Sequence, residues 1–185
     1  PLASGVRMPD PVEETVAFAG QKLDFSIDYL PGEIKITFRS PSMQGKKVSA
    51  DISVAVPPGH ETLNVVVPWS GSRFQFTSKQ NTLPAEGSIE VGGDTYNLKP
   101  GKAFACLDFG RGVWPYETKW NWASSSSWQG KRLVGLNLGG KWTDGTGSTE
   151  NGVCLDGKLF KISDRAVFSY DRSDFMLPWS VKTQE

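Results

Sequence analysis

Histidine is almost absent from this chain, and cysteine is scarce. One histidine, His60, and two cysteines, Cys106 and Cys154, occur in 185 residues. A zinc site usually needs two or three His or Cys ligands, and a Ser-His-Asp triad would depend on His60 alone, without a GxSxG elbow. We therefore expect no metal and no cofactor, and we interpret His60, in the turn-like run 57–61, as an exposed loop histidine.

The two cysteines do not form a CxxC motif. Each lies in an apolar, strand-like run, Ala103–Leu107 or Val153–Leu155. This setting favours two buried free thiols. A disulfide between Cys106 and Cys154 is the alternative, and it would imply an oxidising compartment.

An excess of charge is also lacking. Lys plus Arg is 20 and Asp plus Glu is 20, so the formal net charge is zero. This balance argues against a nucleic-acid partner and against a polybasic membrane patch. No run of eighteen apolar residues predicts a transmembrane helix, and the lack of a signal peptide favours the cytoplasm. Because the chain begins with Pro1, we expect a processed terminus or a fragment of a longer protein.

Helical periodicity is missing as well, and alternation of apolar and polar residues takes its place. Residues 23–29 and 33–39 both alternate with period two, which predicts half-buried strands. Turn signals join such segments at Pro31-Gly32, at Gly92-Gly93-Asp94 and at Asp156-Gly157. The pattern predicts an all-β fold, either an antiparallel barrel or a strongly bent sandwich with little helix. We expect a flexible lead-in over residues 1–14 and a single domain over 15–185.

Tryptophan is concentrated in one part of the chain. Five of the seven tryptophans fall between residues 114 and 142. Period two would place Trp120 and Trp122 on one face of a strand and Asn121 on the other. In the run 135–139, Asn137 would share a face with two glycines and oppose Leu136 and Leu138. Asn121 and Asn137 are therefore candidate amide groups on the wall of a cavity, which would hold water or a ligand.

Charged residues flank the tryptophans. Asp108 and Arg111 are expected at a strand end, either as a surface ion pair or as a buried acid–cation pair beside Trp114. Arg111 is our candidate for the fixed cation of a site, because its guanidinium stays protonated and can stack on an indole. Asp144 and Glu150 occupy a glycine-rich loop that either presents a carboxylate to a ligand or caps its own turns.

An earlier polar stretch follows an alternating strand. Lys79 and Gln80 end the segment that begins at Arg73. They are candidates for the mouth of a cavity, and a solvated turn is the alternative.

The motifs 108–116, 120–123 and 135–152, with Lys79-Gln80 and 83–87, resemble the DUF2804 family. The resemblance runs from about Glu61 to Val181. It implies a distant similarity to the lipocalin-like (calycin) proteins that include carotenoid hydratases and the AttH group, and therefore an antiparallel barrel with a ligand cavity. The family has no assigned chemistry, and its members are longer, so the resemblance implies a C-terminal part of a longer protein.

These observations lead to three hypotheses of function, and the third is an interaction protein whose tryptophans simply form its core. The first is a module that binds an apolar or amphipathic small molecule in a tryptophan-lined cavity. The second is a hydratase, an isomerase or a glycan-acting enzyme that uses Asp108 or Glu150 as its general acid or base. The residues expected to bind the ligand are Lys79, Gln80, Arg111, Trp114, Tyr116, Trp120, Asn121, Asn137, Trp142, Asp144 and Asn151.

Overall fold

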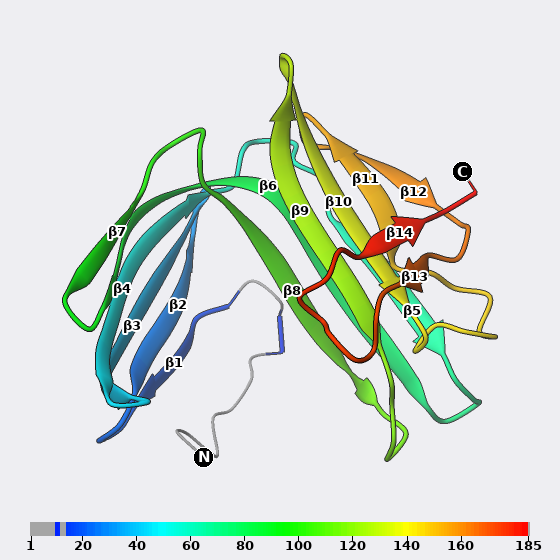
Figure 1. Cartoon of the computed structure of the whole chain (residues 1–185), viewed down its shortest axis with the longest axis horizontal. Coiled ribbons are helices and arrows are strands. Elements are labelled where there is room, and N and C mark those ends of the chain that lie inside the picture. The colour runs from blue at the N-terminus through cyan, green and yellow to red at the C-terminus, as the bar shows by residue number, and fades with distance from the viewer. Residues whose placement is uncertain (1–9, 12–13, 185) are drawn as a thin grey trace. The chain divides into compact units, whose positions relative to one another are not determined.

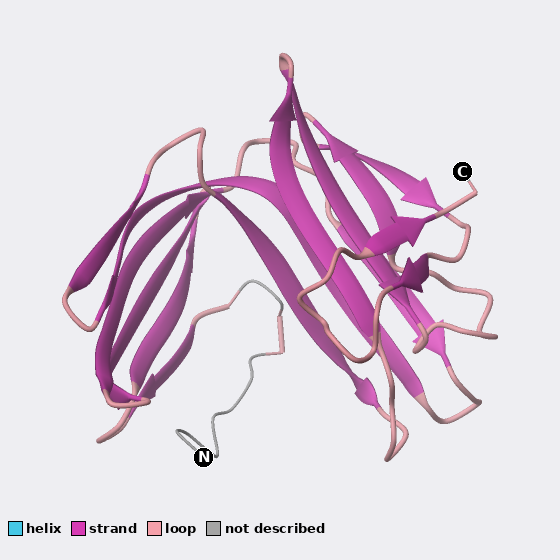
Figure 2. Cartoon of the chain, viewed as in Figure 1, coloured by secondary structure: helices cyan, strands magenta, loops and turns pink. Residues whose placement is uncertain are grey.

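The computed structural model of the chain describes residues 10–11 and 14–184. Throughout this part the regular structure is antiparallel β-strand, with no helix, which confirms the predicted all-β class (Figures 1 and 2). No helix that could span a membrane is found among these residues. The predicted lead-in over residues 1–14 lies mostly outside the described residues.

The chain divides into two compact units. Unit 1 comprises residues up to Pro58 together with Leu83–Ala105, and unit 2 comprises Gly59–Thr82 together with the residues from Cys106 onward. Two strands, β6 (Phe74–Val91) and β8 (Phe104–Val113), contribute residues to both units. Because these strands are shared, the division leaves the single-domain prediction untested.

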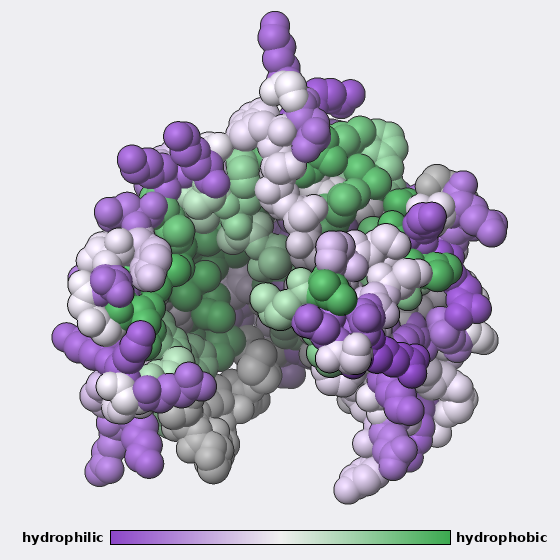
Figure 3. Space-filling view, viewed as in Figure 1, coloured by the Kyte–Doolittle hydropathy of each residue, from purple (hydrophilic) through white to green (hydrophobic). Residues whose placement is uncertain are grey.

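Unit 1 is an antiparallel sheet whose strands follow one another in chain order. Ile27, Ile36 and Ile52 lie opposite one another on adjacent strands, so the period-two pattern gathers apolar side chains on one face. Figure 3 shows hydrophobic residues collected on one face of these strands. The strands are β1 (Val16–Ala19), β2 (Asp24–Leu30), β3 (Glu33–Met43), β4 (Lys46–Ala55), the second part of β6 and β7 (Asp94–Leu98).

The core of unit 1 is apolar. Four buried side chains form it, and half-buried isoleucines from β2, β3 and β4 pack around them. Those four residues are Ile34, Val54, Leu83 and Ala85.

Unit 2 contains two facing sheets and a short third one. The first sheet places β5 (Leu63–Pro68) and β8 on either side of the first part of β6. The second has the order β12-β11-β10-β9, and a separate pair joins β13 to β14. The bounds are β9 (Asn121–Gln129), β10 (Arg132–Gly140), β11 (Asn151–Leu155), β12 (Lys158–Ile162), β13 (Val167–Ser169) and β14 (Ser180–Lys182).

Polar contacts join the two large sheets of unit 2. Asn81 Nδ2 on β6 donates to Ser124 Oγ on β9 at 2.7 Å, and Ser126 Oγ accepts from the Thr82 amide at 2.9 Å. The sheets therefore pack as a sandwich, and within the described residues they are open ladders, not a closed barrel.

The predicted hairpins are confirmed. Pro31-Gly32 joins β2 to β3, Gly92-Gly93 joins β6 to β7, and Asp156-Gly157 joins β11 to β12. At the last turn φ is 50° for Asp156 and 82° for Gly157. Two central residues with positive φ are what a type I′ hairpin requires.

Three predicted boundaries were wrong because strands run further than the local alternation indicates. The stretch after Thr77 is not a solvated turn but the buried centre of β6, a strand that pairs with β5 up to Lys79 and with β4 from Ala85 onward. Asp108 and Arg111, which were predicted at a strand end, lie inside β8, because this strand continues to Val113. β9 starts at Asn121 and continues through four serines, so Trp120 precedes the strand.

Candidate functional site

A buried lysine is the central feature of unit 2. The side chain of Lys79 is only 1% exposed, and its residue pairs with Leu63 across β5 and β6. An ammonium group withdrawn from water is costly unless charged or polar partners surround it. The partners of Lys79 therefore define the candidate site.

Two carboxylates contact the same ammonium group. Lys79 Nζ donates to Asp108 Oδ1 on β8 and lies 3.5 Å from Glu150 Oε2. The Asp108 side chain is 45% exposed, whereas that of Glu150 is completely buried. One carboxylate of the group thus meets solvent, and the other is enclosed.

Glu150 is a fully buried carboxyl with a raised pKa. Burial is the main cause that raises its pKa to about 7; Lys79 lowers the pKa and the charge of Asp108 raises it. Lys79 and Thr77 are the polar side chains that lower the pKa, and within the part of the chain that the structure describes neither carboxylate oxygen of Glu150 accepts a hydrogen bond of good geometry. The group therefore exchanges its proton near neutral pH.

Tryptophan rings form walls around the lysine. Lys79 Nζ lies 5.1 Å from the ring centroid of Trp122 and 5.4 Å from that of Trp142, both within cation–π range. Trp114 packs against Trp142 at 6.3 Å between centroids and against Trp69 at 5.4 Å. Because Trp114 and Trp122 are partly exposed, the cluster reaches the surface of the unit.

Asn137 ties one wall to the acid. Its Oδ1 accepts from Trp122 Nε1 at 2.9 Å, and its Nδ2 donates to the backbone carbonyl of Glu150 at 2.5 Å. The indole N–H of Trp122 can only donate and the Glu150 carbonyl can only accept, so these two partners fix the orientation of the Asn137 amide. Asn137, which is buried, therefore fixes the position of Glu150 relative to Trp122.

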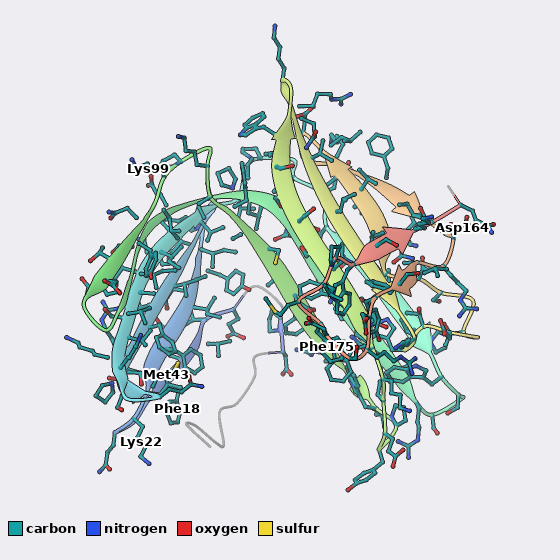
Figure 4. The ribbon with its side chains drawn as sticks, viewed as in Figure 1. Phe18, Lys22, Met43, Lys99, Asp164 and Phe175 are labelled. Atoms are coloured by element: carbon teal, nitrogen blue, oxygen red, sulfur yellow. The ribbon has the colours of Figure 1, made fainter. Side chains whose placement is uncertain are left out.

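Asn151 supports the backbone next to Glu150. Its Oδ1 accepts from the Gly139 amide and its Nδ2 donates to the Asp164 carbonyl, each at 2.7 Å. Asp164 is labelled in Figure 4 on the connection after β12. The amide predicted to bind a ligand is thus engaged in holding β10, β11 and that connection together.

The structure brings together Lys79, Asp108, Asn137, Trp142 and Glu150, and it places Trp114 beside Trp142. Both carboxyl candidates thus contact one buried cation, although they lie on separate elements.

Other predicted residues lie elsewhere. Arg111 is exposed, with its guanidinium 5.3 Å from the Phe109 ring centroid, and Lys79 occupies the buried position that we had expected Arg111 to take. Gln80 Nε2 donates to Thr62 at 2.7 Å, and Asp144 forms an ion pair with Arg165. Tyr116 and Trp120 are exposed.

Asn121 contacts a different aromatic group. Its Nδ2 lies 3.5 Å from the hydroxyl of Tyr170, whose ring stacks on Trp179 at 4.1 Å between centroids. Phe175, labelled in Figure 4, completes this cluster. Asn121 therefore belongs to this second aromatic cluster and not to the group around Lys79.

Trp122 was missing from the predicted site. Its alternation with Trp120 was visible in the sequence, but the sequence did not show that the strand begins between them. Cys106 and Cys154 are free thiols; Cys154 is buried as predicted, whereas Cys106 lies on the exposed face of β8 with Asp108. His60 is half-buried, not exposed.

The charged group has the components of proton transfer: a carboxyl that titrates near neutrality, a fixed cation and a second carboxylate open to solvent. Among the described residues, no three His, Cys, Asp or Glu side chains gather as a set of metal ligands.

Comparison with known proteins gives one match. The family described as "Domain of unknown function (DUF2804)" matches residues 1–185, the whole chain. No curated protein and no solved structure matches it. The extent of the family match confirms the resemblance carried by the motifs around Lys79, Asp108 and Glu150. The chain therefore belongs to the DUF2804 family.

Proposed function

We propose that unit 2 acts on a small molecule by proton transfer, with Glu150 as the general acid and base. The observation that carries this proposal is the Glu150 carboxyl: fully buried, 3.5 Å from Lys79 Nζ, and with a pKa raised to about 7. A catalytic group with a pKa near the working pH can both donate and accept a proton efficiently.

Lys79 stabilises the negative charge that proton transfer creates. Its ammonium stabilises the Glu150 anion after proton donation, and it can stabilise negative charge that develops on a substrate oxygen. Asp108 holds Lys79 from the solvent side, since its half-exposed carboxylate accepts a hydrogen bond from Nζ. Hydration, dehydration and isomerisation all include proton transfers that an acid–base group of this kind can perform.

The tryptophans indicate the class of substrate. Trp114 and Trp122 present partly exposed indole surface beside the charged group, and Trp142 lies against Lys79. Small-molecule sites combine apolar and aromatic walls with a few polar groups. An apolar or amphipathic molecule with one polar group directed at Lys79 fits this combination.

A glycan substrate is less well supported. Paired carboxylates of glycosidases flank the scissile bond, with the sugar between them. Here Lys79 Nζ contacts both Asp108 and Glu150 and thus stands between the two carboxyl groups.

A binding module without chemistry is the second candidate. The contacts among Trp69, Trp114 and Trp142 favour it, because an aromatic cluster of this kind can hold a ligand without any proton transfer.

Deuterium exchange separates the two candidates. The purified chain is incubated in D₂O with a small-molecule extract of its source organism, and after return to H₂O mass spectrometry searches for metabolites that have gained carbon-bound deuterium. The variants are Glu150→Gln and, as a matched control, Glu86→Gln on the exposed part of β6 in unit 1.

We expect deuterium gain with the original chain and with Glu86→Gln, and its loss with Glu150→Gln. A metabolite that stays bound in native mass spectra of both variants without gaining deuterium would identify a binding module. Exchange that is equal in Glu150→Gln would show that Glu150 is not the acid–base group.

A further inference from the structure

A second group of reactive side chains lies in unit 2, apart from the lysine site. Thr82 Oγ1 on β6 is 3.2 Å from His60 Nε2 and 3.4 Å from Cys154 Sγ on β11. The sulfur is 4.0 Å from the same imidazole nitrogen. A thiol, a hydroxyl and an imidazole thus meet at one point, and none of them takes part in the Lys79 site.

We propose that Cys154, Thr82 and His60 form a proton relay that makes Cys154 a site of oxidation by hydrogen peroxide. A hydroxyl has one proton and two lone pairs, so it can accept from one neighbour and donate to another at the same time. In the relay the Cys154 thiol donates to Thr82 Oγ1, and the Thr82 hydroxyl donates to His60 Nε2. Removal of the thiol proton along this path leaves the thiolate, which is the nucleophilic form of cysteine.

The imidazole is suited to receive the proton. His60 Nδ1 is buried and has no hydrogen-bond partner among the described residues, so Nε2 is the nitrogen that faces the relay. The next residue, Glu61, accepts from the Leu159 amide at 2.7 Å and from Lys158 Nζ at 3.1 Å. The Leu159 hydrogen bond is the main cause that lowers the pKa of Glu61, so a carboxylate follows His60 directly in the chain.

The backbone around Cys154, Thr82 and His60 has two unusual features that allow their side chains to meet. Thr82 has φ of 62°, a conformation that is rare for a β-branched residue. A Cβ on Gly135 would come within 2.7 Å of the Thr82 methyl carbon and 3.4 Å of Cys154 Cβ. Glycine at 135 therefore leaves the room that places Thr82 against Cys154.

The burial of Cys154 limits the size of the reagents that can reach its sulfur. Cys154 is 3% exposed, so a bulky alkylating agent cannot reach its sulfur, whereas a neutral molecule close to water in size can. Hydrogen peroxide meets both conditions. The thiolate attacks one peroxide oxygen, the O–O bond breaks and an S–O bond forms; sulfur is oxidised by two electrons, and the leaving hydroxide takes the proton from His60 to give water.

The test compares two cysteines in the same chain. The folded protein is treated with hydrogen peroxide for increasing times and quenched, sulfenic acid is trapped with dimedone after unfolding, and the peptides that contain Cys154 and Cys106 are quantified. Cys106 is the internal control, because it is free and exposed. Parallel samples receive N-ethylmaleimide, a bulkier thiol reagent.

We expect peroxide to oxidise Cys154 at least about fivefold faster than Cys106, although N-ethylmaleimide modifies Cys106 first. Thr82→Val keeps the β-branched shape and removes the hydroxyl, so it should slow oxidation of Cys154 about tenfold and leave Cys106 unchanged. Thr77→Val, which removes another buried hydroxyl of β6, should leave both rates unchanged. His60→Gln provides a second test of the relay if Thr82→Val does not fold.

Two results would overturn the relay: faster oxidation of Cys106 than of Cys154 in the original chain, or an unchanged Cys154 rate in a folded Thr82→Val or His60→Gln variant. Because the readout is oxidation of a thiol, it does not depend on the proton-transfer function proposed for Glu150.

Discussion

The interiors of the two units differ: that of unit 1 is apolar, and that of unit 2 is polar and charged. Unit 1 buries Ile34, Val54, Leu83 and Ala85, and none of its described charged residues is buried. Unit 2 buries a lysine, a glutamate and several amides between its sheets.

The same strand shows the change from one type of interior to the other. β6 is polar and buried from Thr77 to Thr82, in unit 2, and becomes apolar at Leu83, where unit 1 begins. Apolar burial stabilises a fold at any pH, whereas buried charges are costly and persist only with partners. We infer that unit 1 serves stability, and that the polar interior of unit 2 is where function would be found.

The strongest test of this difference removes the buried cation. Lys79→Met keeps the length of the side chain but leaves Asp108 and Glu150 without their shared partner, so it should destabilise the protein by about 3–5 kcal/mol. Lys35→Met, which removes an exposed partner of Glu33 in unit 1, should cost less than about 0.5 kcal/mol. Denaturant unfolding measures both, and equal effects would remove the contrast between the units.

Truncation of the apolar core should cost a similar amount without any dependence on pH. Leu83→Ala deletes a fully buried side chain of unit 1, and we expect a loss of about 2–5 kcal/mol. Unfolding at pH 5 and at pH 8 should give the same difference from the original chain. A loss that changes with pH would show that the core of unit 1 is coupled to a titrating group.

Glu150→Gln should reveal the pH dependence of unit 2. The pKa of Glu150 rises from an ordinary 4.5 to about 7 on folding, so its protonated form adds stability below pH 4.5 that is lost as the pH rises to 7. Gln keeps the neutral form. Relative to the original chain, Glu150→Gln should therefore gain about 3 kcal/mol between pH 4 and pH 8. Glu86→Gln is the matched control, and a flat difference for Glu150→Gln would contradict the raised pKa.

Removal of the Asn137 amide, which links Trp122 to Glu150, should have a smaller effect on the free energy of unfolding. Asn137→Leu leaves Trp122 Nε1 and the Glu150 carbonyl without partners, for a loss of about 1–3 kcal/mol. Asn97→Leu changes the same residue type on the exposed strand β7 of unit 1 and should be nearly neutral. If thermal unfolding shows Asn137→Leu to be neutral too, the amide does not position Glu150.

The smallest effect concerns Arg111. The sequence led us to expect a buried organiser, for which Arg111→Lys would cost several kcal/mol. Because Arg111 is exposed on β8, the substitution should change the free energy of unfolding by less than about 0.5 kcal/mol. A larger loss would restore Arg111 as a structural cation of unit 2.

Local patterns predicted much of the fold. Alternation and turn residues act over a few positions, so the hairpin at Asp156-Gly157 and the strands β2 and β3 could be recognised from the sequence alone. The length of β6 could not, since a polar run such as 77–82 is buried only if distant strands supply partners for it.

The site was predictable in its residue types but not in its geometry. Asp108 and Glu150 were recognised as carboxylates near tryptophans, and Lys79 as a residue near a cavity. That one ammonium group would contact both carboxylates depends on the pairing of β6 with β8 and on the packing of the second sheet. The same packing covers Lys79 and leaves Arg111 exposed. The residues that flank each of them in the sequence do not predict this difference.

A direct titration of Glu150 tests the central claim. In protein labelled with ¹³C at the δ-carbon of glutamate, NMR follows each carboxyl resonance from pH 3 to pH 9, and Glu150→Gln identifies the resonance of Glu150. We predict one glutamate that titrates near pH 7 and is missing from the variant. If every glutamate titrates below about pH 5, as exposed glutamates do, Glu150 is an ordinary carboxylate and unit 2 lacks its acid–base group.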